Sequence, residues 1–137
     1  MRDCVFCKIR DGEIPAMKID EDEHTLSFMD VNPLNPGHCL VVTKRHVPNI
    51  FDADVEDLQA VVATAKRIAV AIQAELKPGG LNLLQANGTA AFQSVAHFHL
   101  HLVPRFANDG KGFDWKLVPG DREAIMRISE RLRALLK

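Results

Sequence analysis

The chain has 137 residues, of which 47% are hydrophobic and 26% charged, so the composition is that of one folded globular domain and excludes a disordered protein. Lys and Arg number 17 against 18 Asp and Glu, and this net charge of −1 excludes the basic surface that a nucleic-acid-binding domain needs. No apolar stretch approaches the ~20 residues of a membrane-spanning helix and no signal-peptide pattern opens the chain, so we expect a cytoplasmic protein that binds no membrane.

Apolar segments between turn signals divide the chain into three expected helices and four expected strands. In chain order they are a helix, two strands, a long helix, two strands and a last helix, over residues 5–11, 25–29, 39–43, 54–77, 81–84, 98–103 and 122–136. The apolar face of the long helix is expected to consist of Val55, Leu58, Val62, Ala65, Ala69, Ile72 and Leu76. Strands in hairpins, with helices between and after them, predict an α+β domain with a largely antiparallel sheet.

Three of the six histidines lie within five positions, at His97, His99 and His101. Residues 97–103 (HFHLHLV) alternate polar and apolar side chains, so in a strand the three imidazoles share one face and the apolar side chains enter the core. Imidazole serves as a nucleophile, as a general acid or base, or as a metal ligand. Three imidazoles in strict alternation therefore indicate a site for an anion or a metal ion.

Two kinds of chemistry fit this strand. Histidines at alternate positions can hold a catalytic metal ion, with His97, His99 and His101 as its ligands. In the other interpretation the middle imidazole attacks phosphorus, while its neighbours orient it and neutralise charge on the phosphate oxygens. The loop before the strand, residues 87–89 (NGT) and 93–94 (QS), is neutral and rich in hydrogen-bond donors, which favours a phosphate ester.

The loop and the strand together, residues 87–89, 93–96 (QSVA) and 97–103, closely resemble the histidine triad (HIT) superfamily of nucleotide hydrolases and transferases. The N-terminal half is similar to the Hint branch of that superfamily in five segments, CVFCKI (4–9), GEIP (12–15), FMDVNP (28–33), PGH (36–38) and TKRHV (43–47). The resemblance covers residues 4 to about 105, and this set of motifs in this order is specific.

The resemblance implies a HIT-like α+β fold with an antiparallel sheet of about five strands, one long helix, a shorter N-terminal helix and a C-terminal helix. The chain, 1–137, would be a single HIT domain with its core over about 4–105 and a C-terminal extension over 106–137. A homodimer is implied as well, because members of the family usually pair sheet and helix across a twofold axis.

The resemblance also implies an enzyme, a HIT-type nucleoside phosphoramidase or nucleotide hydrolase. His99 would be the nucleophile that forms a nucleotidyl-histidine intermediate, and the main-chain carbonyl of His97 would fix its tautomer. His101 matches the triad histidine that contacts phosphate oxygens, and His38 matches a supporting histidine beside it. Ser94 matches the Ser or Thr that donates to the leaving atom. The expected substrates are phosphoramidates, acyl-adenylates or dinucleoside polyphosphates of a purine.

The AMP or GMP moiety of such a substrate would lie in a pocket with an apolar wall for the base and one carboxylate for the ribose. By resemblance, the residues that would bind it are Phe6, Ile9, Phe28, Val31, Asp30, Asn87 and Gln93. The four apolar residues match the base pocket, Asp30 matches the acceptor for the ribose hydroxyls, and Gln93 lies on the phosphate loop.

Cys4 and Cys7 have the spacing of half a tetrahedral zinc site. In relatives, two such cysteines bind structural zinc with two histidines, and the matching set here is Cys4, Cys7, His46 and His97. A site of this kind would pin the N-terminal segment against the catalytic strand. In the other interpretation the two cysteines are free thiols that pack as small apolar side chains, and His46 is a surface residue. No organic cofactor is expected.

Several positions depart from the family's pattern or have no role in it. Phe92 stands where a small residue, commonly Gly, precedes the Gln of the phosphate loop, and Ala86 replaces an Asn of some relatives. Trp115 either reaches toward the partner's site or packs with Phe113 on its own domain, and His24 is expected to be an ordinary surface residue. Besides the enzyme, two functions remain open: a nucleotide-binding regulatory protein with little turnover, and a metalloenzyme with the triad histidines as ligands.

Overall fold

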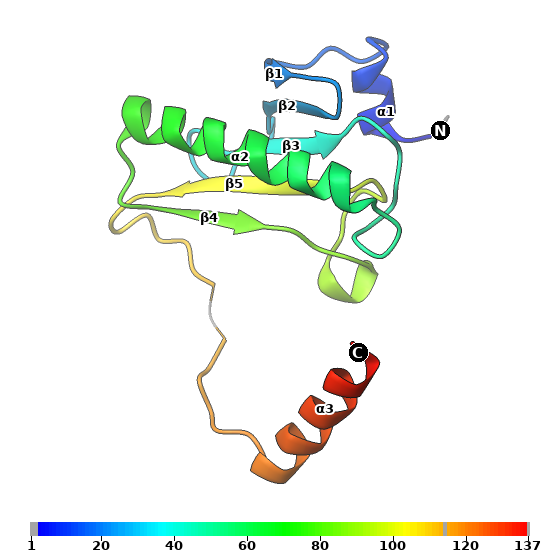
Figure 1. Cartoon of the computed structure of the whole chain (residues 1–137). Helices are drawn as coiled ribbons and strands as arrows, with labels where there is room; N and C mark the ends of the chain where they lie inside the picture. The colour runs from blue at the N-terminus through cyan, green and yellow to red at the C-terminus, as the bar shows by residue number, and fades with distance from the viewer. Residues whose placement is uncertain (1–2, 114, 137) are drawn as a thin grey trace.

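The structure is a computed structural model that describes residues 3–113 and 115–136. Its elements are, in chain order, α1 (Val5–Arg10), β1 (Lys18–Glu21), β2 (Thr25–Met29), β3 (Cys39–Thr43), α2 (Val55–Leu76), β4 (Gly80–Leu84), the 3₁₀ turn η1 (Thr89–Ala91), β5 (His99–Arg105) and α3 (Arg122–Leu135) (Figure 1). The expected α+β class, with a five-stranded antiparallel sheet, one long helix, a short N-terminal helix and a C-terminal helix, is confirmed.

The five strands form one sheet in the order β1-β2-β3-β5-β4, and each neighbouring pair is antiparallel. The strand β5, which carries two of the triad histidines, therefore lies between β3 and β4. His99 lies opposite Val42 of β3, and His101 lies opposite Leu40. These four side chains share one face of the sheet, because directly opposite residues of an antiparallel pair point to the same side.

The strand β3 contributes to a hydrophobic core on each face of the sheet. All five of its residues are buried. Cys39 and Val41 pack in the core beneath α2, which runs along one face of the sheet (Figure 1). Leu40 and Val42 pack in a second core with residues of α1. Since the histidines of β5 share the face of Leu40 and Val42, they lie on the α1 side of the sheet.

The helix α2 buries only part of the expected row: Ala65 and Ile72 lie in the core, and Leu58 and Ala69 pack against it. Val55 and Val62, which the helical spacing placed on the inner face, are 67% and 63% exposed. The row that packs on the sheet consists of Val61, Ala65, Ile68 and Ile72. The prediction was partly wrong because this helix has apolar residues on two sides, and spacing alone does not show which side meets the sheet.

The strand β1 was not expected from the sequence. Its residues, KIDE, form an edge of the sheet that pairs only with β2, and three of the four are exposed. An edge strand that is open to solvent on both faces needs no alternation of apolar and polar side chains. Hydrophobic periodicity therefore does not reveal it.

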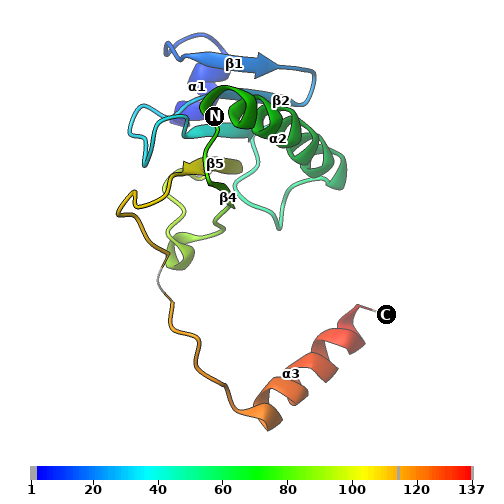
Figure 2. The ribbon, with the colours of Figure 1, turned by 90° about the vertical axis from the view of Figure 1, so that its left-hand side faces the viewer.

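After β5 the chain leaves the sheet and ends in α3. The side chain of Asp121 caps this helix by accepting a hydrogen bond from the N–H of Glu123 at 3.1 Å, as its sequence position predicts. None of the described residues of α3 is buried, and Figures 1 and 2 both show the helix standing apart from the sheet, beyond β4. Over residues 3–113 and 115–136, no helix combines the length and the apolar character that crossing a membrane would require.

Candidate active site

A cavity of about 450 Å³ opens on the α1 side of the sheet. Its walls come from α1, from the end of β2 and the residues after it, and from β5 with the loop that precedes it. Eight of the residues expected at the site line this cavity together: Phe6, Ile9, Phe28, Asp30, Val31, Ser94, His99 and His101. The fold therefore gathers around one space the residues that were expected to act as nucleophile, base wall and ribose acceptor.

His99 lines the cavity and is only 5% exposed. Its Nδ1 lies 2.7 Å from the main-chain carbonyl oxygen of His97. A carbonyl oxygen can only accept, so Nδ1 carries the proton and Nε2 keeps its lone pair. Burial lowers the pKa of His99, although the bond to His97 and the charge of Asp30 act in the opposite direction. The ring is thus a neutral imidazole with one unprotonated nitrogen, the form that a nucleophile requires.

His38 and His101 form a hydrogen-bonded pair beside His99. The main-chain N–H of Leu34 donates to Nδ1 of His38 at 2.9 Å, so His38 carries its proton on Nε2. That Nε2 lies 2.9 Å from Nδ1 of His101 and donates to it. His101 therefore keeps its own proton on Nε2, where it is available to an anion. Burial, reinforced by the neighbouring His99 and His38, lowers the pKa of His101 to about 4, so this ring is neutral at pH 7.

Asp30, His38 and His101 also bring their possible ligand atoms within 4.8 Å of one another, as a metal site would. Oδ2 of Asp30 lies 3.4 Å from Nε2 of His38. A metal ion needs a lone pair on that nitrogen, but the N–H of Leu34 occupies the Nδ1 lone pair and leaves the proton on Nε2. The hydrogen bond between His38 and His101 therefore orients a proton donor, and the carboxylate of Asp30 lies beside this pair.

Of the expected residues in the loop before β5, Ser94 lines the cavity, whereas Asn87 and Gln93 do not. Ser94 is exposed at the rim. The side chain of Gln93 accepts from the N–H of Gly88 at 2.7 Å and donates to two main-chain carbonyls. The side chain of Asn87 accepts from the N–H of Ile50 at 2.8 Å. The amides of Gln93 and Asn87 thus hold the loop in shape from outside the cavity.

Phe92 and Trp115 are both exposed, and neither lines the cavity. Phe92 has a left-handed φ of 65° and is 90% exposed, so its ring does not narrow the site. A left-handed φ also explains why a glycine suits this position. Trp115 is 77% exposed and does not pack on its own domain, whereas the ring of Phe113 lies 5.2 Å from the guanidinium carbon of Arg105.

The four residues expected to bind zinc meet in one cluster between α1 and the start of β5. Sγ of Cys4 lies 3.2 Å from Nδ1 of His97, and Sγ of Cys7 lies 3.3 Å from Nδ1 of His46. The two Nδ1 atoms are 3.1 Å apart. Bond lengths of ~2.0–2.3 Å in a tetrahedral zinc site separate the ligand atoms by about 3.3–3.8 Å. The cluster therefore has the ligand types of a structural zinc site and nearly its dimensions.

His97 presents the correct nitrogen to this cluster. Its Nε2 lies 2.7 Å from the carbonyl oxygen of Thr43 and must donate to it, which leaves the Nδ1 lone pair for a metal ion. Burial lowers the pKa of His97 to about 4, so the ring is neutral, as a ligand must be. Because His97 belongs to this cluster and His99 belongs to no group of possible ligands in the described part of the chain, the geometry does not support one metal ion held by all three triad histidines.

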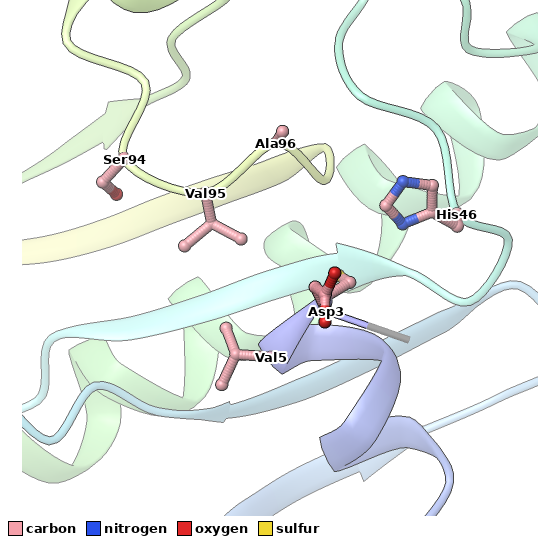
Figure 3. A pocket seen from close by; sticks show the side chains of 7 residues that line it. Asp3, Val5, His46, Ser94, Val95 and Ala96 are labelled. Atoms are coloured by element: carbon pink, nitrogen blue, oxygen red, sulfur yellow. The ribbon is translucent and has the colours of Figure 1, made fainter. Parts of the chain in front are cut away.

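A second hollow, of about 700 Å³, adjoins the cavity at the loop before β5 (Figure 3). Val5, Ser94 and Val95 line both spaces. Asp3 and His46 line only the second hollow, which therefore lies beside the metal-binding cluster. Ser94 thus lies between the space next to His99 and the second hollow.

Sequence reasoning missed the main-chain groups that set the histidine tautomers. The N–H of Leu34 and the carbonyl of Thr43 leave no signal in a sequence, because every residue except proline has both groups. His24, expected to be an ordinary surface residue, has a side chain that is 33% exposed, and its Nδ1 also lies 3.3 Å from the carboxylate of Asp57, a buried residue of α2.

Comparison with known proteins agrees with this geometry. The HIT domain family matches residues 11–108. The protein Hit of Bacillus subtilis is 44% identical over 94% of this chain and 91% of its own length. The adenosine 5'-monophosphoramidase hnt1 of Schizosaccharomyces pombe is 33% identical over 98% of both chains.

Solved structures give the same result. The crystal structure of a HIT family protein from Bacillus anthracis superposes with a TM-score of 0.91, at 40% identity over 98% of both chains. A histidine triad family protein from Mycobacterium smegmatis, described as Zn-bound, superposes with a TM-score of 0.77, at 38% identity over 98% of this chain and 96% of that one. From its family match, its relatives and its fold, the chain belongs to the HIT family.

Proposed function

We propose that the protein is a nucleotide hydrolase or transferase that acts at the α-phosphate of a purine nucleotide derivative, such as a phosphoramidate, an acyl-adenylate or a dinucleoside polyphosphate. The observation that carries this proposal is the 2.7 Å hydrogen bond from Nδ1 of His99 to the carbonyl of His97, because it leaves the Nε2 lone pair free in a ring that lines the cavity. The relative from S. pombe, named an adenosine 5'-monophosphoramidase, supports the same reaction class.

The reaction would take place in two displacements at phosphorus. In the first, the Nε2 lone pair of His99 forms a bond to the α-phosphorus, and the bond from phosphorus to the leaving atom breaks with its electron pair going to that atom. Ser94, between the cavity and the second hollow, donates to the leaving atom. In the second, a water oxygen attacks the same phosphorus, and the electron pair of the N–P bond returns to Nε2. One water is consumed overall: its hydroxyl group ends on phosphorus in the nucleoside monophosphate, and its other proton balances the one that the leaving atom has gained.

His101 would stabilise the charge that develops on the phosphate oxygens. Its Nε2 proton is held in place because Nδ1 is occupied by His38, which is itself oriented by the N–H of Leu34. A donor that is already oriented costs no reorganisation when the charge develops, and one such donor is typically worth about 10²–10³ in rate.

The nucleoside would lie along α1 and β2, with its base on an apolar wall and its ribose at a carboxylate. Asp30 accepts from the ribose hydroxyls, and the amides of Asn87 and Gln93 act by shaping the phosphate loop. The base wall consists of Phe6, Ile9, Phe28 and Val31.

A structural zinc ion would be held by Cys4, Cys7, His46 and His97. When bound, the ion supplies no reacting group, because four protein ligands complete a tetrahedral site and leave no open position. The residues of this chain then act by position: α1, which begins at Val5 next to Cys4, is joined to His97 at the start of β5. The Zn-bound protein from M. smegmatis supports this proposal.

We also propose a homodimer that works in the cytoplasm. The sheet ends at β4, so one edge of this strand is free to pair with a second copy. On the outward side of α2, Val55, Leu58 and Val62 line an apolar hollow of about 480 Å³ that a second copy would cover. A reducing compartment suits the free cysteines, since thiols that stay reduced remain available to a metal ion.

A substrate panel tests the proposed activity. The purified protein is mixed with adenosine and guanosine 5'-phosphoramidates and with a dinucleoside polyphosphate, and the release of AMP or GMP is measured. We expect release by the wild type, loss of about 10³-fold or more in His99→Ala, and little change in His24→Ala, which lies outside the cavity. Quenching during turnover in alkaline denaturant, in which the N–P bond survives, should trap one nucleotidyl group on the peptide that contains His99, and acid should then release it.

Two results would overturn the proposal. An unchanged rate in His99→Ala would exclude His99 as the nucleophile. Tight binding of AMP or GMP by the wild type, with no release of product from any substrate, would instead identify a nucleotide-binding regulatory protein.

A further inference from the structure

The helix α3 has an apolar face that the described part of the chain leaves exposed. Ile125, Ile128, Leu132 and Leu135 follow one another at spacings of three and four residues, so they form one stripe along the helix. Their exposed fractions run from 53% to 82%, and no described residue of α3 is buried. A solvated helix gains nothing from such a stripe, whereas a helix that packs against a protein surface needs one.

The segment that leads to α3 is apolar and exposed as well. Trp115, Leu117 and Val118 are 77%, 88% and 74% exposed. We call residues 115–136 the C-terminal arm. A monomeric soluble protein rarely exposes apolar side chains of this number on one continuous segment, and such surfaces usually mark an interface.

The direction of the C-terminal arm is the same in a crystal structure of a relative. The arm makes up about a sixth of the chain. If the two C-terminal arms ran in different directions, about a sixth of the residues would not superpose and the TM-score would stay below about 0.85. The crystal structure of the B. anthracis protein superposes with a TM-score of 0.91 over 98% of both chains, so its arm runs in the same direction. A helix without packing in its own chain does not keep one direction unless another molecule supports it.

The position of the arm points to a second copy of this chain as that molecule. In Figures 1 and 2 alike, α3 stands beyond β4, which is the edge strand of the sheet. A second copy that paired with the free edge of β4 would occupy the side on which α3 stands.

The charges agree with this position. α3 contains four Arg and two Glu, whereas the rest of the chain contains 13 Lys and Arg against 16 Asp and Glu. A basic helix is therefore complementary to the acidic remainder of another copy.

We infer that the C-terminal arm docks on a second copy of this chain, so that the two chains of a dimer exchange their α3 helices. The stripe of Ile125, Ile128, Leu132 and Leu135 faces the partner, and each chain gives and receives one helix. The inference rests on the proposed dimer and adds a contact to it. It is independent of the proposed phosphate chemistry, which uses residues of α1, β2 and β5.

A photo-crosslinking amino acid placed in α3 tests the exchange. At position 132 it replaces a residue of the stripe, and at position 134 it replaces Ala134 on the opposite face of the same helix, which serves as the matched control. We expect irradiation at 132 to give a covalent dimer on a denaturing gel and irradiation at 134 to give at least tenfold less. A crosslink at 132 that stays within one chain would overturn the inference.

A matched pair of full-length variants measures the contribution of the stripe. Leu132→Glu should raise the dissociation constant of the dimer at least tenfold by sedimentation, and Ala134→Glu should change it less than twofold. Both residues are exposed in the single chain, so neither change disturbs the core. Equal dimer affinity in the two variants would overturn the exchange while leaving a dimer through β4 intact. A wild type that stays monomeric at 100 µM would overturn both, and AMP release by that monomer would still support the proposed activity.

Discussion

The Nδ1 of His99 lies 2.7 Å from the carbonyl oxygen of His97, and the ring of His97 belongs to the cluster of possible zinc ligands. The main chain of His97 therefore contacts the proposed nucleophile, and its side chain belongs to the possible metal site. The ring is held on its far side by the carbonyl of Thr43 at 2.7 Å. A metal ion on Nδ1 would hold the ring of His97 on its other side. It would thereby also fix the main-chain carbonyl of His97, which sets the tautomer of His99.

Removing one metal ligand should lower both metal content and stability. We expect Cys7→Ser to bind 10–100-fold less tightly to zinc and to unfold at a lower temperature, because a hydroxyl is a poorer zinc ligand than a thiolate. Metal content after dialysis, measured by mass spectrometry, and the Tm check this expectation. Cys39→Ala is the control, since Cys39 is equally buried but lies in the core beneath α2, and this variant should keep its zinc while losing stability. Equal zinc content in the two variants would contradict the assignment of Cys7.

Breaking the bond between His38 and His101 should slow the reaction more than it weakens binding. In His38→Leu, Nδ1 of His101 loses its 2.9 Å donor, so the ring is free to move its proton to the wrong nitrogen. We expect kcat to fall by about tenfold or more, in line with a lost hydrogen bond of ~1.5 kcal/mol, and KM to change less than threefold. Steady-state kinetics check this, with His24→Leu as the control histidine. A change in KM alone would assign His38 to substrate binding.

The acid limb of the pH profile should depend on the charge of Asp30. Burial lowers the pKa of His101 to about 4, so protonation removes its neutral form only in acid, and kcat/KM should stay level from pH 8 to about 5 before it falls. The negative charge of Asp30 raises the pKa of His101, so Asp30→Asn should lower that pKa and move the acid limb to lower pH. Measurements on a dinucleoside polyphosphate from pH 3.5 to 8 check the direction. The exposed Glu75 offers a control, since Glu75→Gln should leave the limb in place. An acid limb that moves to higher pH in Asp30→Asn would exclude His101 as its origin.

A methyl group at Gly37 should destabilise the fold. Gly37 has a φ of +90°, and an added Cβ would overlap Cδ1 of Leu76 and lie 3.0 Å from Cγ of Pro104. We expect Gly37→Ala to lower the free energy of unfolding by about 2–4 kcal/mol, as backbone strain and overpacking add. Urea denaturation measures the loss. Gly88 has the same φ with no atom within 4 Å of an added Cβ, so Gly88→Ala isolates the strain and should cost only about 1–2 kcal/mol. Equal losses would show that the packing around Gly37 yields to the methyl group.

The parts of the fold that could be predicted from the sequence are those with a strong local pattern. The bounds of β2 and β3 agree with the expected 25–29 and 39–43, because each is a short apolar run between turn residues. Eight of the residues that the family resemblance assigned to the site line one cavity. They could be predicted because a motif of fixed spacing is typical of residues that one fold brings together.

The parts that could not be predicted depend on long-range packing or on main-chain groups. Which side of α2 meets the sheet, and hence the exposure of Val55 and Val62, follows from the strands beneath it and not from the helix. Asp121 marks the start of α3, but no pattern within the helix shows that it stands away from the sheet. The proton position on His38 depends on the N–H of Leu34, which any residue except proline would supply.

The alternation of β3 between two cores has a consequence for how the protein loses activity. Cys39 and Val41 pack in the core beneath α2, while Leu40 and Val42 pack in the core on the face that carries His99 and His101. The four residues follow one another along a single strand. A slip of one residue would exchange the contents of both cores. Neither half can therefore come apart while the other persists, and the scaffold and the site should melt in a single cooperative step.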